Sequence, residues 1–206
     1  RKEVAFIARH GLQHEYPPHM IPYKANLYAF RELGVTRVIA PSAVGSLKRE
    51  IRPGDFVITD QFVNFTNRED TFYNEMPVTH ISAADPYCPE LRKFIINMGH
   101  SLKLPLHEKG TVVVTNGPRF ASRAESEFYR KNGWDIINMT QYPEIVLARE
   151  MEMCYANISL VTDYDAGVKD EIAPVSTAEV AHVFSQNIGK LKRLIFDCIP
   201  NLSEKR

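Results

Sequence analysis

Short apolar runs punctuate this sequence, and each ends in small, polar or charged residues. Runs of this length, rich in branched side chains, are typical of buried strands. The five runs are Val4–Ala8 before Arg9, Arg37–Pro41 before Ser42, Gly110–Thr115 before Asn116, Asp135–Ile137 before Asn138 and Ile158–Val161 before Thr162. Ligands of open α/β sheets bind at the carboxyl ends of strands. The repetition therefore predicts a site built from strand ends.

Helical patterns alternate with these runs. We expect helices over Tyr23–Leu33, Pro89–Leu102, Ala121–Asn132, Tyr142–Met151 and Ser176–Ile199, with Gly34 and Gly133 ending two of them. Gly54–Asp60 is typical of a turn that feeds another strand, whereas Phe62–Ala84 is long, polar and aromatic with few periodic cues. The alternation predicts one α/β domain over residues 1–206, a three-layer α/β/α architecture with a mixed, largely parallel central sheet.

Composition narrows the classes of function. Lys+Arg and Asp+Glu both number 25, so no basic field is present to attract nucleic acid. No apolar stretch approaches the roughly 20 residues that span a bilayer, and no segment resembles a secretory signal. The cysteines Cys88, Cys154 and Cys198 are odd in number and scattered, so we expect three small core residues in a reducing compartment. We therefore expect a cytoplasmic protein without a membrane segment.

Two carboxylates, Asp163 and Asp165, follow the last apolar run. On an extended backbone, residues i and i+2 point the same way, so both acids would share one face. Paired like charges raise a pKa, and such a pair suits a ligand that offers N–H donors or a leaving group that must be protonated. The alternative is a turn that carries two solvated aspartates.

An ordered series of motifs resembles the trimeric purine nucleoside phosphorylase family, in its methylthioadenosine phosphorylase branch. The motifs are Ala8-Arg9-His10-Gly11 with Gln13-His14, Ala43-Val44-Gly45-Ser46-Leu47, Pro53-Gly54-Asp55, Asp60-Gln61-Phe62, Asn116-Gly117-Pro118-Arg119-Phe120, Ser122-Arg123-Ala124-Glu125, Asn138-Met139-Thr140, Pro143-Glu144 and Thr162-Asp163-Tyr164-Asp165. The resemblance runs nearly from end to end. It implies a nucleoside phosphorylase-like domain that lacks the family's first strand and glycine-rich phosphate loop, so this chain alone is expected to be weakly active or inactive.

The resemblance implies phosphorolysis. Inorganic phosphate would attack the anomeric carbon of a purine nucleoside and release the base and a pentose 1-phosphate. Catalysis would come from placing an anion beneath the sugar and neutralising the departing base, with phosphate as co-substrate and no metal or organic cofactor.

By this resemblance, phosphate is bound by Arg9, His10, Ser42, the amide of Ala43 and Thr140. Arg9 offers a fixed fork of donors that stays charged. His10 would donate to the same anion, and its alternative role is that of a structural histidine.

The nucleoside would lie against the remaining family positions, which are Met139, Phe120, Asp163, Asp165, Thr177, Val180, His80 and His14. Asp163 and Asp165 would be catalytic, accepting from the adenine amine and protonating the ring as the glycosidic bond breaks. For Met139 and Phe120, ordinary core packing is the alternative. His80 matches a residue that reaches the 5′ substituent across a trimer interface, so a homotrimer or a dimer of trimers is expected.

Base choice rests on two positions. The branch that acts on 6-oxopurines carries a glutamate where this chain has Ala121 and an asparagine where it has Asp163. Both differences favour a 6-aminopurine. Thr177 is more polar than the aliphatic residue frequent in a methylthio pocket, so adenosine is a second candidate substrate, and inosine, methylthioinosine or guanosine remain alternatives.

Two other classes of function compete with a phosphorylase. A nucleoside hydrolase would use water in place of phosphate, which the anion ligands Arg9, His10 and Thr140 argue against. A catalytically impaired nucleoside-binding protein could retain the same fold.

Overall fold

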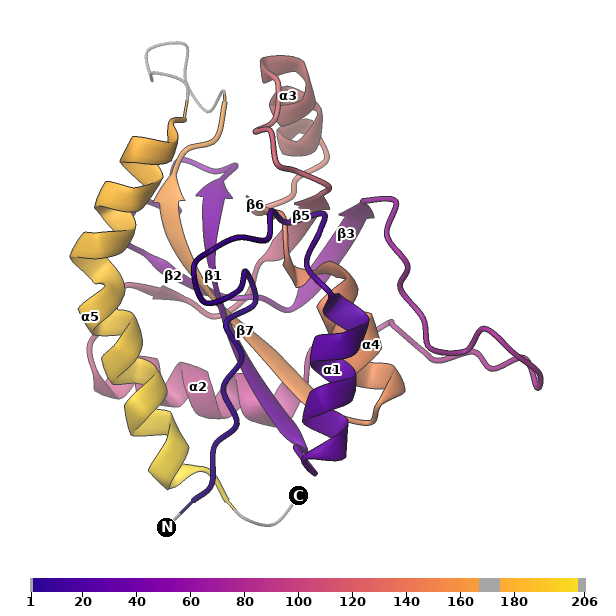
Figure 1. Ribbon diagram of the computed structural model, residues 1–206. Coiled ribbons are helices and arrows are strands. Elements are labelled where there is room, and N and C mark those ends of the chain that lie inside the picture. Colours follow the sequence, from indigo (N-terminus) through magenta and orange to yellow (C-terminus); the bar gives the residue numbers. More distant parts are fainter. Residues whose placement is uncertain (1, 167–174, 204–206) are drawn as a thin grey trace.

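The computed structural model describes residues 2–166 and 175–203, and its seven strands form one mixed sheet (Figure 1). The strands, in sheet order, are β3 (Gln61–Phe65), β5 (Thr111–Thr115), β6 (Ile136–Asn138), β1 (Arg37–Ser46), β7 (Cys154–Asp163), β2 (Phe56–Ile58) and β4 (Leu106–His107). Four of the neighbouring pairs are parallel, while β1–β6 and β2–β7 are antiparallel. The predicted mixed, largely parallel sheet is confirmed.

Helices cover both faces of this sheet, which confirms the three-layer prediction. The helices are α1 (Tyr23–Glu32), α2 (Pro89–Ser101), α3 (Arg123–Lys131), α4 (Gln141–Glu150) and α5 (Thr177–Asn201). In Figure 1, α2 and α5 lie on one face of the sheet, α1 and α4 on the other, and α3 beyond its upper end. None of the helices in residues 2–166 and 175–203 is long and apolar enough to cross a membrane.

Alternation along β7 builds the two hydrophobic cores. Ala156, Ile158 and Leu160 face the layer of α2 and α5, whereas Tyr155 and Val161 belong to the core beneath α1 and α4. Successive side chains of a strand point to opposite faces. The nearly continuous burial of β7 therefore reflects cover on both faces, as expected for a central strand.

The helix boundaries match the sequence predictions to within two residues. Gly34 and Gly133 have φ of +72° and +82°, the left-handed conformation that ends a helix and that glycine adopts without strain. At the start of α3, the Ser122 hydroxyl accepts from the Glu125 amide and the Glu125 carboxylate accepts from the Ser122 amide. This capping box places the segment before α3, which bears on the site described below.

Three strand predictions need correction. The run Val4–Ala8 is not a strand, because it pairs with none of the described strands and its Phe6 side chain is 85% exposed. The strand that begins at Arg37 continues through Gly45 to Ser46, so Ser42 lies inside β1 and not after it. The segment that begins at Phe62 opens with an unpredicted strand, β3, which is paired in parallel with β5.

The prediction of three separate thiols was also wrong. Cys88 and Cys154 form a disulfide with Cα atoms 5.1 Å apart, and only Cys198 is a free, buried thiol. The bridge ties the residue before α2 to the first residue of β7. Sequence spacing did not reveal this pair because the two cysteines are 66 positions apart and meet only where the segment before α2 packs against β7, with the Cys88 amide donating to the Tyr155 carbonyl over 2.9 Å.

Candidate active site

A cavity of about 1910 Å³ opens beside the carboxyl ends of β6 and β7 and extends along β1 and α5. Its lining includes the predicted site residues Arg9, His10, His14, Ser42, Ala43, Phe120, Ala121, Met139, Thr140, Asp163, Asp165, Thr177 and Val180. These residues come from the chain's beginning, middle and end. The fold thus brings together every predicted site residue except His80.

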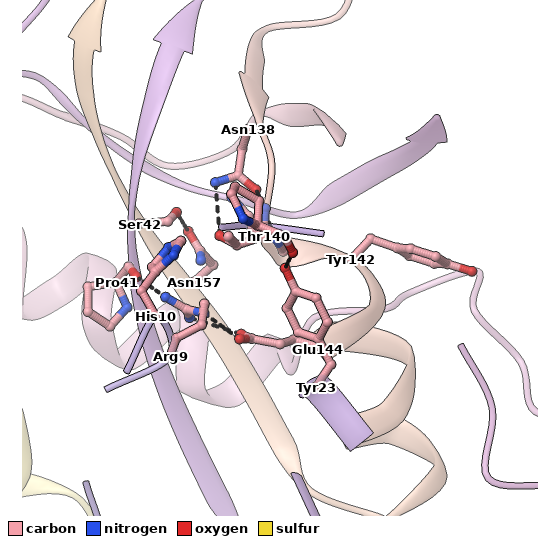
Figure 2. Close-up of polar contacts among 12 residues, drawn as sticks. Arg9, His10, Tyr23, Pro41, Ser42, Asn138, Thr140, Tyr142, Glu144 and Asn157 are labelled. Atoms are coloured by element: carbon pink, nitrogen blue, oxygen red, sulfur yellow. Dashed lines mark hydrogen bonds and ion pairs between the residues drawn. The ribbon is translucent and has the colours of Figure 1, made fainter. Parts of the chain in front are cut away.

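Arg9 is fixed at this cavity by a buried carboxylate (Figure 2). Its Nε and Nη2 donate to the two oxygens of Glu144, the latter over 2.9 Å, and Nη1 donates to the Pro41 carbonyl over 3.1 Å. Glu144 lies in the first turn of α4 and is buried. Burial lowers the pKa of Arg9, but the charge of Glu144 outweighs it and raises that pKa above its ordinary value. The guanidinium is therefore permanently cationic and held in one orientation.

His10 lies next to the Arg9–Glu144 ion pair, and the tautomer of its ring is defined. Its Nδ1 is 2.8 Å from the carbonyl oxygen of Tyr16, which can only accept, so Nδ1 carries the hydrogen. The ring stacks on His14 at 4.4 Å between centroids, and burial, assisted by His14 and Arg9, lowers the His10 pKa. The neutral ring presents Nε2 as an acceptor. Donation to an anion, the role predicted for His10, requires the protonated ring.

Hydroxyl groups extend the polar lining. Asn138, the last residue of β6, accepts from the amides of Thr140 and Gln141 through Oδ1 at 2.6 and 2.8 Å and so shapes the turn into α4. Thr140 precedes α4 but makes no side-chain cap bond, which leaves its hydroxyl hydrogen available. On β1, the Ser42 hydroxyl donates to Asn157 over 3.1 Å. Figure 2 shows both hydroxyls on the same side of the sheet as Arg9.

The two predicted carboxylates share the cavity, although not by the expected geometry. β7 ends at Asp163, and Asp165 has φ of +51°, so the backbone turns and does not remain extended. Asp163 Oδ1 accepts from the Asp165 amide over 2.8 Å, and Oδ2 accepts from the Thr162 hydroxyl over 2.7 Å. Both acids are 4% exposed. The alternative of two solvated aspartates is thereby excluded.

Burial controls the protonation of this pair. It raises the pKa of Asp163 to about 6, against hydrogen bonds from Thr162 and the Asp165 amide that lower it. Burial likewise raises the pKa of Asp165. A carboxyl group with a pKa near neutrality can donate a proton as well as accept one.

The other lining residues are positioned by local structure. Phe120 and Ala121 lie just before the capping box of α3, where the two Nη atoms of Arg119 donate to the Glu125 carboxylate, each over 2.8 Å. Thr177 and Val180 begin α5. Phe120 is partly exposed and lines the cavity, so the alternative of ordinary core packing does not describe it.

His80 lies apart from the cavity, on an exposed loop that follows β3 and projects from the body (Figure 1). The loop is anchored at its base, where Arg68 donates to the carbonyls of Tyr142 and Asn116 over 2.6 and 2.8 Å. Nearer the tip, Met76 is 85% exposed. Within the described part of this chain, His80 therefore serves no site.

Glu144 and Gly45 lie in motifs of the resemblance, but the sequence assigned neither of them a role. A carboxylate inside the apolar stretch of α4 is the signal for Glu144, because a buried charge requires a partner. A Cβ on Gly45 would lie 2.9 Å from Asp163 Oδ1 and 3.0 Å from Ile137 Cγ2. Gly45 thus permits the close approach of β1 to the carboxylate, a requirement that no sequence pattern states.

A cationic clamp and a pair of protonatable carboxylates on one cavity define a class of protein. They are suited to α/β enzymes that bring an anion together with a substrate bearing N–H groups. The family model of the phosphorylase superfamily matches residues 1–200 of this chain. The chain belongs to that superfamily, and the membership predicted from the motifs is confirmed.

Individual relatives agree with this assignment. The S-methyl-5′-thioadenosine phosphorylase of Pyrococcus horikoshii is 55% identical over 99% of this chain and 78% of its own length. The 6-oxopurine nucleoside phosphorylase of Pyrococcus furiosus is 47% identical over 100% of this chain and 80% of its own length. A solved methylthioadenosine phosphorylase of Schistosoma mansoni in complex with adenine is 35% identical, with a TM-score of 0.89 over 93% of this chain and 74% of that one.

The raised pKa of Asp163 predicts a pH-dependent stability. The pKa of this side chain rises from its ordinary value of 3.8 to about 6 in the fold, so the folded state holds the proton more tightly than the unfolded chain. Its contribution to the free energy of unfolding, up to about 3 kcal/mol, is complete below pH 3.8 and is lost as the pH rises through 6. Urea unfolding of Asp163→Asn between pH 4 and 7 should lack that loss.

The exposed control Asp85→Asn should retain the wild-type pH dependence. Equal slopes in wild type and Asp163→Asn would show that Asp163 titrates normally.

Proposed function

We propose that this chain cleaves 5′-methylthioadenosine with inorganic phosphate, giving adenine and 5-methylthioribose 1-phosphate. The observation that carries the proposal is the shared cavity, which Arg9 and the pair Asp163 and Asp165 line together. Relatives named S-methyl-5′-thioadenosine phosphorylase, 52–55% identical to this chain, support it. The enzyme is a pentosyltransferase of purine and methionine salvage, and residues 1–206 act as a single domain.

Phosphate is held by Arg9, the hydroxyl of Thr140 and the amide of Ala43, while the Ser42 hydroxyl, whose hydrogen is donated to Asn157, accepts from a protonated phosphate oxygen. Three of the five Arg9 N–H groups are engaged by protein oxygens, which leaves two for the anion. Neutral His10 accepts from a protonated phosphate oxygen, and the protonated ring donates to the anion. No metal or organic cofactor is needed, because the anion is itself the nucleophile.

The chemical step depends on charge at two ends of the nucleoside. As the glycosidic bond breaks, the sugar becomes cation-like and the purine anion-like. Phosphate stabilises the first change, and proton donation from Asp163 or Asp165 stabilises the second. Met139 packs against the sugar and Phe120 against the base.

The base is a 6-aminopurine. Asp163 accepts from its exocyclic amine, while Ala121 lacks the carboxylate that would accept from a ring N–H of a 6-oxopurine. Adenosine is the second candidate, since Thr177 adds a hydroxyl near the 5′ pocket that Val180 and His14 also line. The 47% identity to a 6-oxopurine nucleoside phosphorylase keeps inosine and guanosine in the test set.

The active assembly is a homotrimer or a dimer of trimers, in which the loop that carries His80 completes a neighbouring pocket. Three aromatic residues of this region, Phe65, Phe72 and Tyr73, contact their own chain. Phe72 packs on the core, Phe65 joins an aromatic cluster and the Tyr73 hydroxyl donates to Glu150. Met76 and Val78, largely exposed near the loop tip, are the better candidates for interface contacts.

The enzyme acts in the cytoplasm, and neither nucleic acid nor a membrane is a partner. The Cys88–Cys154 disulfide counts against a reducing compartment, where disulfides are rare outside hyperthermophiles, so the redox state of these two cysteines in the purified protein tests this assignment.

Arg9→Ala should raise the phosphate KM about 10- to 100-fold, because charge-assisted hydrogen bonds are worth about 1.5–3 kcal/mol. Arg9→Lys keeps a cation beside Glu144 and should also raise the phosphate KM. The measurement is adenine release at varied phosphate, with exposed Arg31→Ala as control. Release that is independent of phosphate in the wild type would identify a hydrolase, and nucleoside binding without turnover would identify an impaired enzyme.

Asp163→Asn should shift the preference from adenine toward 6-oxopurine nucleosides. An amide can donate to a 6-keto oxygen, whereas a carboxylate cannot. The preference should not invert, because Ala121 still lacks the matching carboxylate. A panel of methylthioadenosine, adenosine, inosine and guanosine measures the ratios of kcat/KM, and unchanged ratios would remove Asp163 from base recognition.

Mixed oligomers test the role of His80. Chains with Arg9→Ala and chains with His80→Ala are each impaired in a different part of a shared site. After co-assembly, some sites regain both residues, so the activity should exceed that of either parent. Activity equal to the average of the parents, in oligomers verified as mixed, would mean that His80 contributes to no neighbouring site.

A further inference from the structure

Behind Arg9 lies a buried pair, Glu144 and Tyr155, for which the proposed reaction has no direct use. We propose that Glu144, held in turn by Tyr155, is a positioning residue that fixes the Arg9 guanidinium for the incoming anion. The inference rests on the proposed function in one respect, that Arg9 binds phosphate.

Donor counting shows what Glu144 leaves free. A guanidinium has five N–H groups. Glu144 takes one from Nε and one from Nη2, and the Pro41 carbonyl takes one from Nη1. The two that remain belong to Nη1 and Nη2, so an anion meets a pair of donors whose direction Glu144 has already set.

The backbone that carries Arg9 is a turn outside the sheet, closed by the Gly11 amide, which donates to the Ala8 carbonyl over 2.8 Å. The residues before Arg9 form no helix or strand, and none of their described backbone groups joins the sheet. The side chain of Arg9, by contrast, reaches into the body of the protein and contacts β1 through Pro41 and α4 through Glu144. These side-chain contacts connect an irregular segment to β1, which carries Ser42, and to α4, which begins directly after Thr140.

Glu144 is itself constrained. It is 6% exposed, and its two oxygens meet Arg9 Nε, Arg9 Nη2 and the hydroxyl of Tyr155. A buried carboxylate costs several kcal/mol unless it is paired and hydrogen-bonded, so other rotamers of Glu144 are strongly disfavoured. The Arg9–Glu144 fork therefore behaves as one rigid unit.

Tyr155 supplies the third contact. It lies on β7, 1% exposed, and donates from its hydroxyl to Glu144 Oε2 over 2.9 Å. Burial and the nearby Glu144 charge raise its pKa well above the ordinary value, so the phenol stays neutral and remains a donor. Through this bond, the rigid central strand supports α4 at the point where α4 holds Arg9.

Glu144 also carries a cost for anion binding, which makes the proposal testable. Its negative charge balances that of Arg9, so an anion is attracted less than by a free arginine. A charge-balancing role predicts that Glu144→Gln tightens phosphate binding. A positioning role predicts the opposite, because the amide offers a donor where Arg9 needs an acceptor.

The experiment compares Glu144→Gln, Glu144→Asp and Tyr155→Phe in the proposed phosphorolysis, with separate KM values for phosphate and nucleoside. We expect Glu144→Gln to raise the phosphate KM about 10-fold or more while the nucleoside KM changes less than about twofold. Glu144→Asp keeps the charge but shortens the fork, so it should also raise the phosphate KM. Tyr155→Phe should give a smaller rise in the same direction. Exposed Glu152→Gln and Tyr28→Phe are matched controls.

The outcomes separate the two proposals. A phosphate KM unaffected by Arg9→Ala would overturn the phosphate site itself. A phosphate KM raised by Arg9→Ala but unchanged or lowered in Glu144→Gln and Tyr155→Phe would overturn only the positioning role. Equal rises in both KM values, or a loss of stability with both KM values unchanged, would assign the pair a purely structural role. If Glu144→Gln does not fold, Glu144→Asp and Tyr155→Phe decide by the same criteria.

Discussion

The parallel pairing of β1 with β7 is the interaction on which the rest of the structure depends. Residues Arg37 to Gly45 are aligned with Cys154 to Asp163, with an irregularity only after Val44. Both strands lie in the middle of the sheet, and β7 supplies side chains to the cores on both faces. Since side chains alternate, a slip by one residue would exchange the two faces and bury the wrong set. The same register that satisfies the cores therefore places Gly45 against the Asp163 carboxylate.

Polar groups on one face of these central strands form a connected support for the cavity. The Ser42 hydroxyl donates to Asn157, Asn157 accepts from Ser159, Gln141 donates to Ser159, and the Tyr87 hydroxyl donates to Gln141. All are buried. These hydrogen bonds hold the side chains in fixed positions, although Asn157 Nδ2 lacks a hydrogen-bond partner among the described residues. This support extends from β1 across β7 to α4 and to the segment before α2, and Arg9–Glu144 lies beside it.

The fold treats the two charged components of the cavity in opposite ways. Arg9 is kept charged because a carboxylate faces it, whereas burial favours the protonated form of Asp163, which has no facing cation among the hydrogen bonds and ion pairs of the described residues. Both effects come from the low polarity of the buried surroundings of the two side chains. Taking water away strengthens an ion pair that is complete and raises the pKa of a carboxyl that lacks one. One cavity can therefore hold a permanent cation and a proton donor at the same pH.

The sequence by itself determined the order and type of nearly all the elements. Helix ends at Gly34 and Gly133 and the acids at the end of β7 are local features, set by backbone conformation and side-chain periodicity. Tertiary structure decided what depends on partners distant in sequence. Val4–Ala8 has the composition of a strand but pairs with none of the described strands. Cys88 meets Cys154 only because the segment before α2 packs against β7. Glu144 becomes part of the site because Arg9 needs a buried acceptor. Periodicity records which face of an element is buried; it does not record what lies against that face.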